Sequence, residues 1–255
     1  MSRVLAFIAY SNLFISLCAA SLSAYAQAIF AARVEHAQVL LIFCSTFILY
    51  NGQRLYLSIF QTHQNLHWYL SHRGVLWCMM LAAGFGLYPL LFARLIDLVC
   101  YGACFLLALT YFLPVTNFRK MPVVKSLLVA LVWASVCVLP AGPTVWFWTA
   151  QVCFIGGLCV LFNIRDMAHD TACGTKTVAV SYGVCVARTL AVSLFSLFLV
   201  FDFRWASTVV FGLACAFAFY ARPSRHSYYY LYGVDGLILL QACLGLWAKR
   251  VVVVL

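Results

Sequence analysis

The feature that most limits how this chain can fold is a succession of long apolar runs separated by short polar stretches. A helix that crosses a bilayer needs about 20 largely apolar residues, whereas transmembrane strands are much shorter and alternate in polarity. The runs are too long and too uniform for strands, so we expect an all-α, polytopic membrane bundle of about nine transmembrane helices. The expected spans are 4–24, 37–60, 74–93, 95–115, 123–140, 144–162, 184–201, 204–221 and 228–248.

The composition agrees with this interpretation. Of the 255 residues, 66% are hydrophobic and only 9% are charged, whereas soluble domains carry about 25% charged residues. No stretch of ordinary soluble composition is long enough to form a second domain, so residues 1–255 are interpreted as a single transmembrane domain. The first apolar run is longer than the core of a signal peptide and is interpreted as a retained helix.

The chain is strongly basic, with 16 Lys and Arg against 6 Asp and Glu and a net charge of +10. These charges stand singly between apolar runs, where they meet membrane lipids or mark cytoplasmic loops, so we expect no nucleic-acid partner. Most Lys and Arg fall on the side of the N-terminus and the even-numbered loops. The positive-inside rule then predicts a cytoplasmic N-terminus in a multi-pass protein, which we assign to a bacterial inner membrane.

The polar segment after the sixth span holds the most informative side chains. If the helix continues through it, Asn163, Asp166 and Asp170 share one face at positions i, i+3 and i+7. Two carboxylates one turn apart repel each other unless a cation lies between them, and they suit Mg²⁺. Arg165 and Lys176 add positive charge for a phosphate group. The alternative is a solvated loop in which the two acids pair with Arg165 and Lys176.

The pattern Asp-x-x-x-Asp at 166–170, followed by Gly-x-x-Thr at 174–177, resembles the second aspartate-rich motif of the UbiA family. Members of this family are intramembrane prenyltransferases that usually have nine spans. Arg119 and Lys120 follow the fourth expected span, where the family has a basic cytoplasmic loop. The resemblance covers nearly the whole chain in layout, but only the second motif is specific.

The family's first motif, near the end of the second span, is altered in this chain. Asn51 matches its opening residue, whereas Gly52, Leu55 and Ile59 stand where the family has acids. Half of the usual pair of metal-binding clusters therefore lacks its carboxylates. Either one Mg²⁺ is sufficient, with Arg54 holding the phosphate directly, or the protein no longer transfers prenyl groups.

The resemblance implies Mg²⁺-dependent transfer of a prenyl group from a prenyl diphosphate to a lipophilic acceptor, either aromatic or lipid. The catalytic residues would be Asp166 and Asp170, and Asn163 would join them as a metal ligand. The residues implied in binding the diphosphate are Asn51, Arg54, Arg119, Lys120, Arg165 and Lys176.

One further acid, Asp235, lies several residues inside the last expected span. A charge at membrane depth costs roughly 2.5–3.5 kcal/mol on insertion scales, so we expect a partner for it. Arg54 is the candidate, because both residues are expected near the cytoplasmic ends of their helices. A structural ion pair and a role in the substrate cavity are both open.

Two other functions remain possible from the sequence. The first is a catalytically degenerate UbiA-like membrane protein that binds an isoprenoid lipid or a partner protein, and the altered first motif favours it. The second is a small transporter, which would need internal repeats with interrupted helices or ionisable residues near the midplane.

Overall fold

The computed structural model describes residues 3–31, 33–60, 66–92, 95–112 and 121–254. All regular elements within these ranges are helices, which confirms the all-α prediction for this part of the chain. Among them, nine helices are at least 15 residues long: α2 (Leu13–Phe30), α3 (His36–Phe60), α4 (Leu66–Phe85), α5 (Leu95–Phe112), α6 (Val124–Val138), α7 (Val145–Arg165), α9 (Val178–Phe201), α10 (Trp205–Tyr220) and α11 (Gly236–Val254). The shorter elements are α1 (Arg3–Tyr10), α8 (Met167–Ala172), the 3₁₀ turns η1 (Tyr88–Phe92) and η3 (Leu139–Ala141), and the π-helix η4 (Tyr229–Val234).

Many of these helices are long enough to cross a bilayer. Within the described residues, six segments have the required length and apolar composition: Leu13–Phe30, His67–Leu91, Val124–Ala141, Val145–Arg165, Val178–Phe201 and Tyr229–Lys249. Two shorter apolar helices cover Asp97–Ala108 and Trp205–Tyr220. Helix α3 is not among the six, because polar residues such as Asn51, Gln53 and Arg54 lower its hydropathy. The chain is therefore an integral, multi-pass membrane protein.

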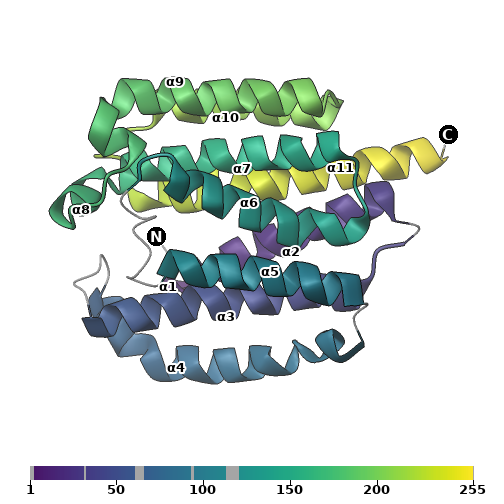
Figure 1. Cartoon of the computed structure of the whole chain (residues 1–255), viewed down its shortest axis with the longest axis horizontal. Helices are drawn as coiled ribbons and strands as arrows, with labels where there is room; N and C mark the ends of the chain where they lie inside the picture. The colour runs from purple at the N-terminus through teal and green to yellow at the C-terminus, as the bar shows by residue number, and fades with distance from the viewer. Residues whose placement is uncertain (1–2, 32, 61–65, 93–94, 113–120, 255) are drawn as a thin grey trace.

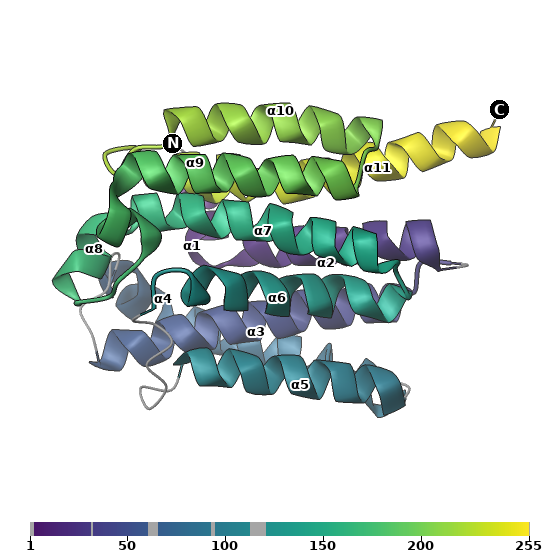
Figure 2. The ribbon, with the colours of Figure 1, turned by 45° about the horizontal axis from the view of Figure 1, so that its top comes forward.

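The helices lie side by side with nearly aligned axes (Figures 1 and 2). α9 and α10 lie along one edge of the bundle, and α3, α4 and α5 lie along the opposite edge (Figure 1). α8 and the start of α9 lie at one end, with the N-terminus toward that end, and the C-terminus lies at the other end. The polar segment after α7 therefore sits at one end of the bundle.

The larger of two hydrophobic clusters joins α2, α6, α7, α9, α10 and α11. α7 packs against both α6 and α9. A glycine permits close packing of α7 and α9, because a Cβ atom on Gly157 would lie 2.4 Å from the ring of Phe195. A smaller cluster joins α3 to α4 through Phe47 and Leu76. The site described below is positioned mainly by helices of the larger cluster.

Three helix boundaries differ from those expected from hydropathy. The first span is interrupted at Asn12, which has a φ of 60°, so that α2 begins at Leu13 rather than near residue 4. α4 begins at Leu66, so part of the polar stretch expected as a loop is helical. α9 begins at Val178, six residues before its expected start, and kinks at Gly183, where φ is 84°. Polar residues at helix ends lower hydropathy without preventing helix formation, which explains the two early starts.

Candidate functional site

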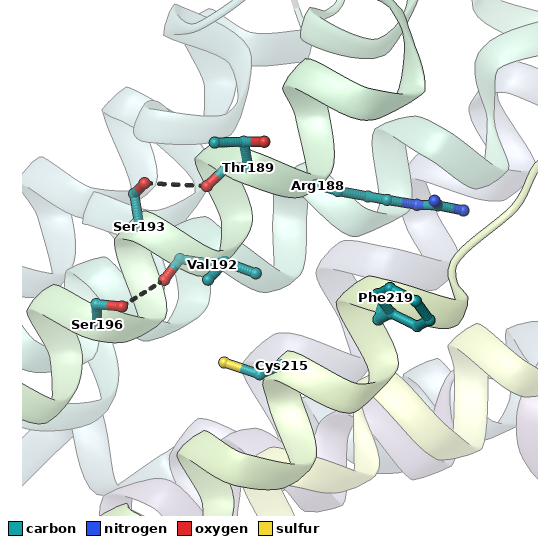
Figure 3. A pocket seen from close by; sticks show the side chains of 7 residues that line it. All are labelled: Arg188, Thr189, Val192, Ser193, Ser196, Cys215 and Phe219. Atoms are coloured by element: carbon teal, nitrogen blue, oxygen red, sulfur yellow. Dashed lines mark hydrogen bonds between the residues drawn. The ribbon is translucent and has the colours of Figure 1, made fainter.

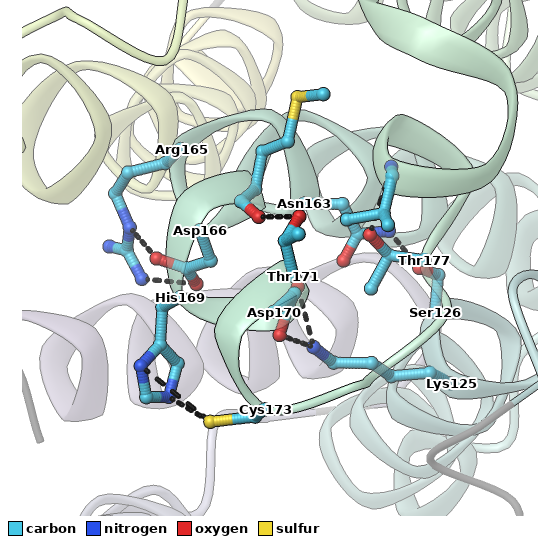
Figure 4. A network of polar contacts seen from close by, with 12 residues as sticks. Lys125, Ser126, Asn163, Arg165, Asp166, His169, Asp170, Thr171, Cys173 and Thr177 are labelled. Atoms are coloured by element: carbon cyan, nitrogen blue, oxygen red, sulfur yellow. Dashed lines mark hydrogen bonds and ion pairs between the residues drawn. The ribbon is translucent and has the colours of Figure 1, made fainter. Parts of the chain in front are cut away.

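The polar segment between α7 and α9 forms a break, a short helix and a new helix start (Figure 4). α7 ends at Arg165, and Asp166 lies at the break with φ −87° and ψ 4°. The condition under which Asn163, Asp166 and Asp170 would share one face of a continuous helix is therefore not met. The break leaves both acids at the same end of the bundle, because the Asp170 amide donates to the Asp166 carbonyl at 2.8 Å.

The turn into α9 follows the signals in the sequence. Gly174 has a φ of 65°, a left-handed conformation that glycine adopts without a Cβ clash. The buried Thr177 is the N-cap of α9, and its hydroxyl accepts a hydrogen bond from the Val180 amide at 3.4 Å. The Gly-x-x-Thr pattern therefore has a structural role here, which is to end α8 and begin α9.

Each of the two acids is paired with its own cation. Asp166 accepts two hydrogen bonds from Arg165, from Nε at 2.7 Å and from Nη2 at 2.8 Å. Lys125, at the start of α6, places its Nζ atom 3.4 Å from both carboxylate oxygens of Asp170. Lys176, the other expected cation, is exposed to solvent. The pairing of the two acids thus brings α6 into the site.

The two acids lie in different environments, although both are outside the candidate spans. The Asp170 side chain is 7% exposed and that of Asp166 is 26% exposed. Burial raises the pKa of Asp170 above its usual value, although Lys125 opposes this effect. Burial also acts on Asp166, but the charges of Arg165, Lys125 and Arg54 outweigh it and hold the pKa of that carboxyl below its usual value. Asp166 is therefore the more firmly ionised of the two.

The two asparagines are both buried but differ in how they are held. The side-chain amide of Asn163 on α7 donates to the Ser126 hydroxyl of α6 at 2.9 Å. Asn51 on α3 uses both side-chain N–H groups internally, on the carbonyls of Ser11 and Phe47 at 2.9 Å each. Its Oδ1 atom accepts from Asn12 at 3.0 Å. A diphosphate can only accept hydrogen bonds. Asn51 could therefore donate to a diphosphate only by giving up its hydrogen bond to the carbonyl of Ser11 or to that of Phe47.

Of the three remaining candidate cations, Arg54, Arg119 and Lys120, the structure describes only Arg54. Arg54, one turn after Asn51 on α3, acts electrostatically on both Asp166 and Tyr69. It therefore belongs to the same end of the bundle as the two acids. Arg119 and Lys120 lie outside the described residues.

Asp235 is buried directly after the π-helix η4, at the start of α11. Its amide donates to the Tyr230 carbonyl at 3.1 Å, and its own carbonyl accepts from the Cys18 thiol at 3.4 Å. Arg165 acts electrostatically on its carboxylate, and the pairing of Asp235 with Arg54 stays a prediction. Single π-helical turns occur often at functional sites.

Sequence reasoning missed Lys125 and Ser126 as members of this site. Both stand at the beginning of an apolar span, beside a basic loop, and a lone lysine in that position usually indicates only the membrane interface. Nothing in the local spacing links Lys125 to Asp170, which follows 45 positions later. Such a contact could have been suspected only from the general requirement that a buried acid has a partner.

These residues could hold a metal ion only together with a ligand. Within the described ranges, no group of three or more His, Cys, Asp or Glu side chains comes together. Mg²⁺ is commonly bound by one or two carboxylates plus substrate phosphates, while water fills the remaining positions. Asp166 and Asp170 fit that donor set, and Arg165, Lys125 and Arg54 supply positive charge for the phosphates.

Comparison with known proteins does not test the resemblance to the UbiA family. That resemblance depends mainly on the pattern at 166–177 and stays a prediction. No family model matches the chain, and no curated protein or solved structure is significantly similar to it.

Proposed function

We propose that the chain is a UbiA-type intramembrane prenyltransferase with nine membrane spans. It transfers a prenyl group from a prenyl diphosphate to a lipophilic acceptor, aromatic or lipid, and depends on Mg²⁺. The observation that carries the proposal is the grouping of Asp166 and Asp170 with Arg165 and Lys125 at one end of the bundle. The active end faces the cytoplasm in this proposal, because most of the Lys and Arg residues belong to that side.

When a metal-bound diphosphate binds, each charged side chain of the two ion pairs could exchange its present partner for the metal ion or a phosphate. The guanidinium of Arg165, now on Asp166, can bind a phosphate in the same two-pronged manner. Asp166 and Asp170, together with Asn163, would then hold Mg²⁺, which neutralises charge on the departing pyrophosphate. Lys125 would turn from Asp170 to the phosphate, so that no charge is left without a partner. Arg54 adds to the positive field.

The reaction breaks the bond between the allylic carbon and the diphosphate oxygen, and both electrons leave with pyrophosphate. The resulting allylic cation is attacked by the acceptor, which then loses a proton. Arg165 and Lys125 stabilise the negative charge that develops on the leaving group. Phe162 and Tyr230 lie beside the site, with ring centres 5.9 Å apart, and aromatic faces of this kind stabilise cations. The allylic cation would have to be kept from water, which would otherwise capture it.

The first prediction tests this activity with charge-neutralising variants in a membrane assay of Mg²⁺-dependent pyrophosphate release. We expect Asp166→Asn and Asp170→Asn each to lower the rate by about 10²-fold or more, because each removes a charge that is needed in the transition state. Asp202→Asn is the matched control, since Asp202 lies at the other end of α9 and pairs with Arg204. The proposal fails if purified protein shows no Mg²⁺-dependent turnover with a panel of prenyl diphosphates and acceptors.

A second candidate is a catalytically degenerate member that binds an isoprenoid lipid. The observation that favours it is Asn51, whose N–H groups are both used internally, beside Gly52 and Leu55 at positions where the family has acids. This candidate predicts isoprenoid binding that survives EDTA and is unchanged in the Asp166→Asn, Asp170→Asn double variant. Loss of binding in EDTA favours the enzyme instead.

A further inference from the structure

A groove of about 470 Å³ lies between α9 and α10, at the edge of the bundle. Its walls combine charged, polar and aromatic side chains (Figure 3). Arg188, Thr189 and Ser193 come from α9, while Phe219 comes from α10. Thr189, Ser193 and Phe219 are exposed on the outer surface of the bundle. Because α9 is a candidate span, this surface faces lipid.

Arg188 is held in place at one end of this groove. Its Nε atom donates to the Ala221 carbonyl at 3.0 Å, and Nη2 donates to the same oxygen. A guanidinium group has five N–H donors, so three remain for another acceptor. Among the described residues, no acidic side chain forms an ion pair with Arg188. The group is thus oriented by the protein but has no acidic partner in the part of the chain that the structure describes.

The charges around the groove favour an anion. Asp202 is the only acidic residue between positions 171 and 234, and it pairs with Arg204 at 3.2 Å. It is 14 residues beyond Arg188, or about 21 Å along the helix axis. Two further basic residues, Arg222 and Arg225, lie one and four positions after Ala221, whose carbonyl holds Arg188, and both are exposed. Basic side chains therefore predominate in this part of the chain near Arg188.

The rest of the groove can accommodate a hydrocarbon chain. Thr189, Ser193 and Ser196 donate their hydroxyl hydrogens to carbonyls four residues earlier in α9, at 3.0–3.2 Å. Hydroxyls bonded in this way tolerate contact with lipid, because no donor is left unsatisfied. Val192 and Phe219 supply apolar walls beside them. One end of the groove thus suits a phosphate, and the remainder suits an acyl chain.

We propose that this groove binds an anionic glycerophospholipid, with its phosphate on Arg188 and an acyl chain between α9 and α10. Basic pockets between transmembrane helices bind anionic headgroups in this way. A zwitterionic lipid would bring its own cation close to Arg188, which disfavours it. The inference goes beyond the proposed enzymatic function and does not depend on it.

The test is a lipid titration of the purified full chain in neutral detergent, followed by native mass spectrometry. Dioleoylphosphatidylglycerol is compared with dioleoylphosphatidylcholine. We expect the anionic lipid to bind about tenfold more tightly and Arg188→Gln to raise its Kd by about tenfold, the equivalent of one charge-assisted contact. Ser193→Leu fills the groove without touching the contact between Arg188 and Ala221, so it should weaken binding even if Arg188→Gln fails to fold. Circular dichroism and elution volume monitor folding.

Arg225→Gln is the matched control, because it removes a neighbouring positive charge that does not line the groove. We expect its affinity to stay within about twofold of the wild type, since exposed charges contribute little. The proposal is overturned if both lipids bind equally or if Arg225→Gln weakens binding as much as Arg188→Gln. Displacement by millimolar inorganic phosphate would reveal a simple anion site. Unchanged lipid binding by Ser193→Leu together with an altered oligomeric state would assign the groove to a second copy of the chain.

Discussion

At the scale of single residues, two aspartates only four positions apart lie in surroundings that shift their pKa values in opposite directions. Asp166 has a two-pronged contact with Arg165, whereas Asp170 is more deeply buried and has a longer contact with Lys125. The pKa of Asp166 is lowered and that of Asp170 is raised. Ionisation of Asp166 therefore stabilises the fold, and ionisation of Asp170 opposes it.

This difference predicts opposite effects of neutral substitutions, measured as thermal unfolding in EDTA. The contribution of Asp166 is present above the unfolded-state pKa and is lost as pH falls through its lower folded-state pKa. Asp166→Asn should therefore reduce stability at pH 7, by about 1–3 kcal/mol, because Arg165 loses its partner. Asp170 behaves in the opposite way, because the fold favours its neutral, protonated form. The stability that this form contributes is present at low pH and is lost as the pH rises through the raised folded-state pKa. Asp170→Asn keeps the group neutral and should therefore increase stability at pH 7.

The control for this prediction is the pH at which the differences vanish. Asp170→Asn should approach the wild type as the pH falls through the usual range of aspartates, where the wild-type carboxyl of Asp170 becomes protonated. Asp166→Asn should do so only at a lower pH, because the pKa of Asp166 lies below that range. If Asp170→Asn proves as destabilising at pH 7 as Asp166→Asn, then the pair with Lys125 stabilises the fold more than burial of the charge opposes it.

At the scale of the elements, contact between α7 and α9 holds the centre of the bundle together. Two adjacent glycines of α7 meet different surroundings. A Cβ atom on Gly157 would overlap the buried ring of Phe195, whereas one on Gly156 would be 3.6 Å from Leu194 and 3.7 Å from Ala130, an ordinary contact. Close approach of helices at small residues is a common means of packing in membranes.

These two glycines form a matched pair for a stability test. Gly157→Ala should lower the free energy of unfolding by about 1–3 kcal/mol, the usual cost of overpacking a buried contact. Gly156→Ala gains the same helix propensity, about 1 kcal/mol, without the overlap and should be neutral or stabilising. Thermal unfolding of both variants in one detergent checks the prediction. Equal melting temperatures would show that Phe195 moves aside without cost.

At the scale of the whole molecule, the candidate site and the Arg188 end of the groove lie at the same end of the bundle. Arg188 lies ten residues after the first residue of α9, and α8, with Asp170, directly precedes that helix. The opposite end holds Asp202, Phe203 and Arg204, between α9 and α10. The two ends therefore differ in charge and polarity. The positive-inside rule predicts that the end with α8 faces the cytoplasm.

Labelling of cysteines at the two ends tests this orientation in intact cells. Cys173, exposed between α8 and α9, is kept as the single cysteine of one variant. In a second variant without native cysteines, Phe203→Cys, at an 80% exposed position, reports on the other end. A membrane-impermeant maleimide should label Phe203→Cys in intact cells and Cys173 only after permeabilisation. The reverse pattern would invert the topology and place the candidate site outside.

Much of the fold could be predicted from the sequence, because a backbone in lipid must satisfy its hydrogen bonds within a helix or a barrel. Apolar runs therefore located long helices such as α7 and α10 within a few residues, whereas the last expected span, 228–248, is divided between the π-helix η4 and α11, which begins at Gly236. Their ends were less certain where polar residues continue a helix, as at Leu66 and Val178. Gly174 and Thr177 mark the start of α9 through local backbone geometry, although hydropathy placed that start six residues later.

The sequence by itself determined that this chain is a helical membrane protein with acids and bases concentrated after α7. Only the tertiary structure decided which charges meet: Lys125 with Asp170, Arg165 with Asp166 and also near Asp235. The physical reason is that an apolar run specifies a helix through interactions within the run. An ion pair between helices depends instead on where those helices cross and how each is rotated, and no local spacing encodes either.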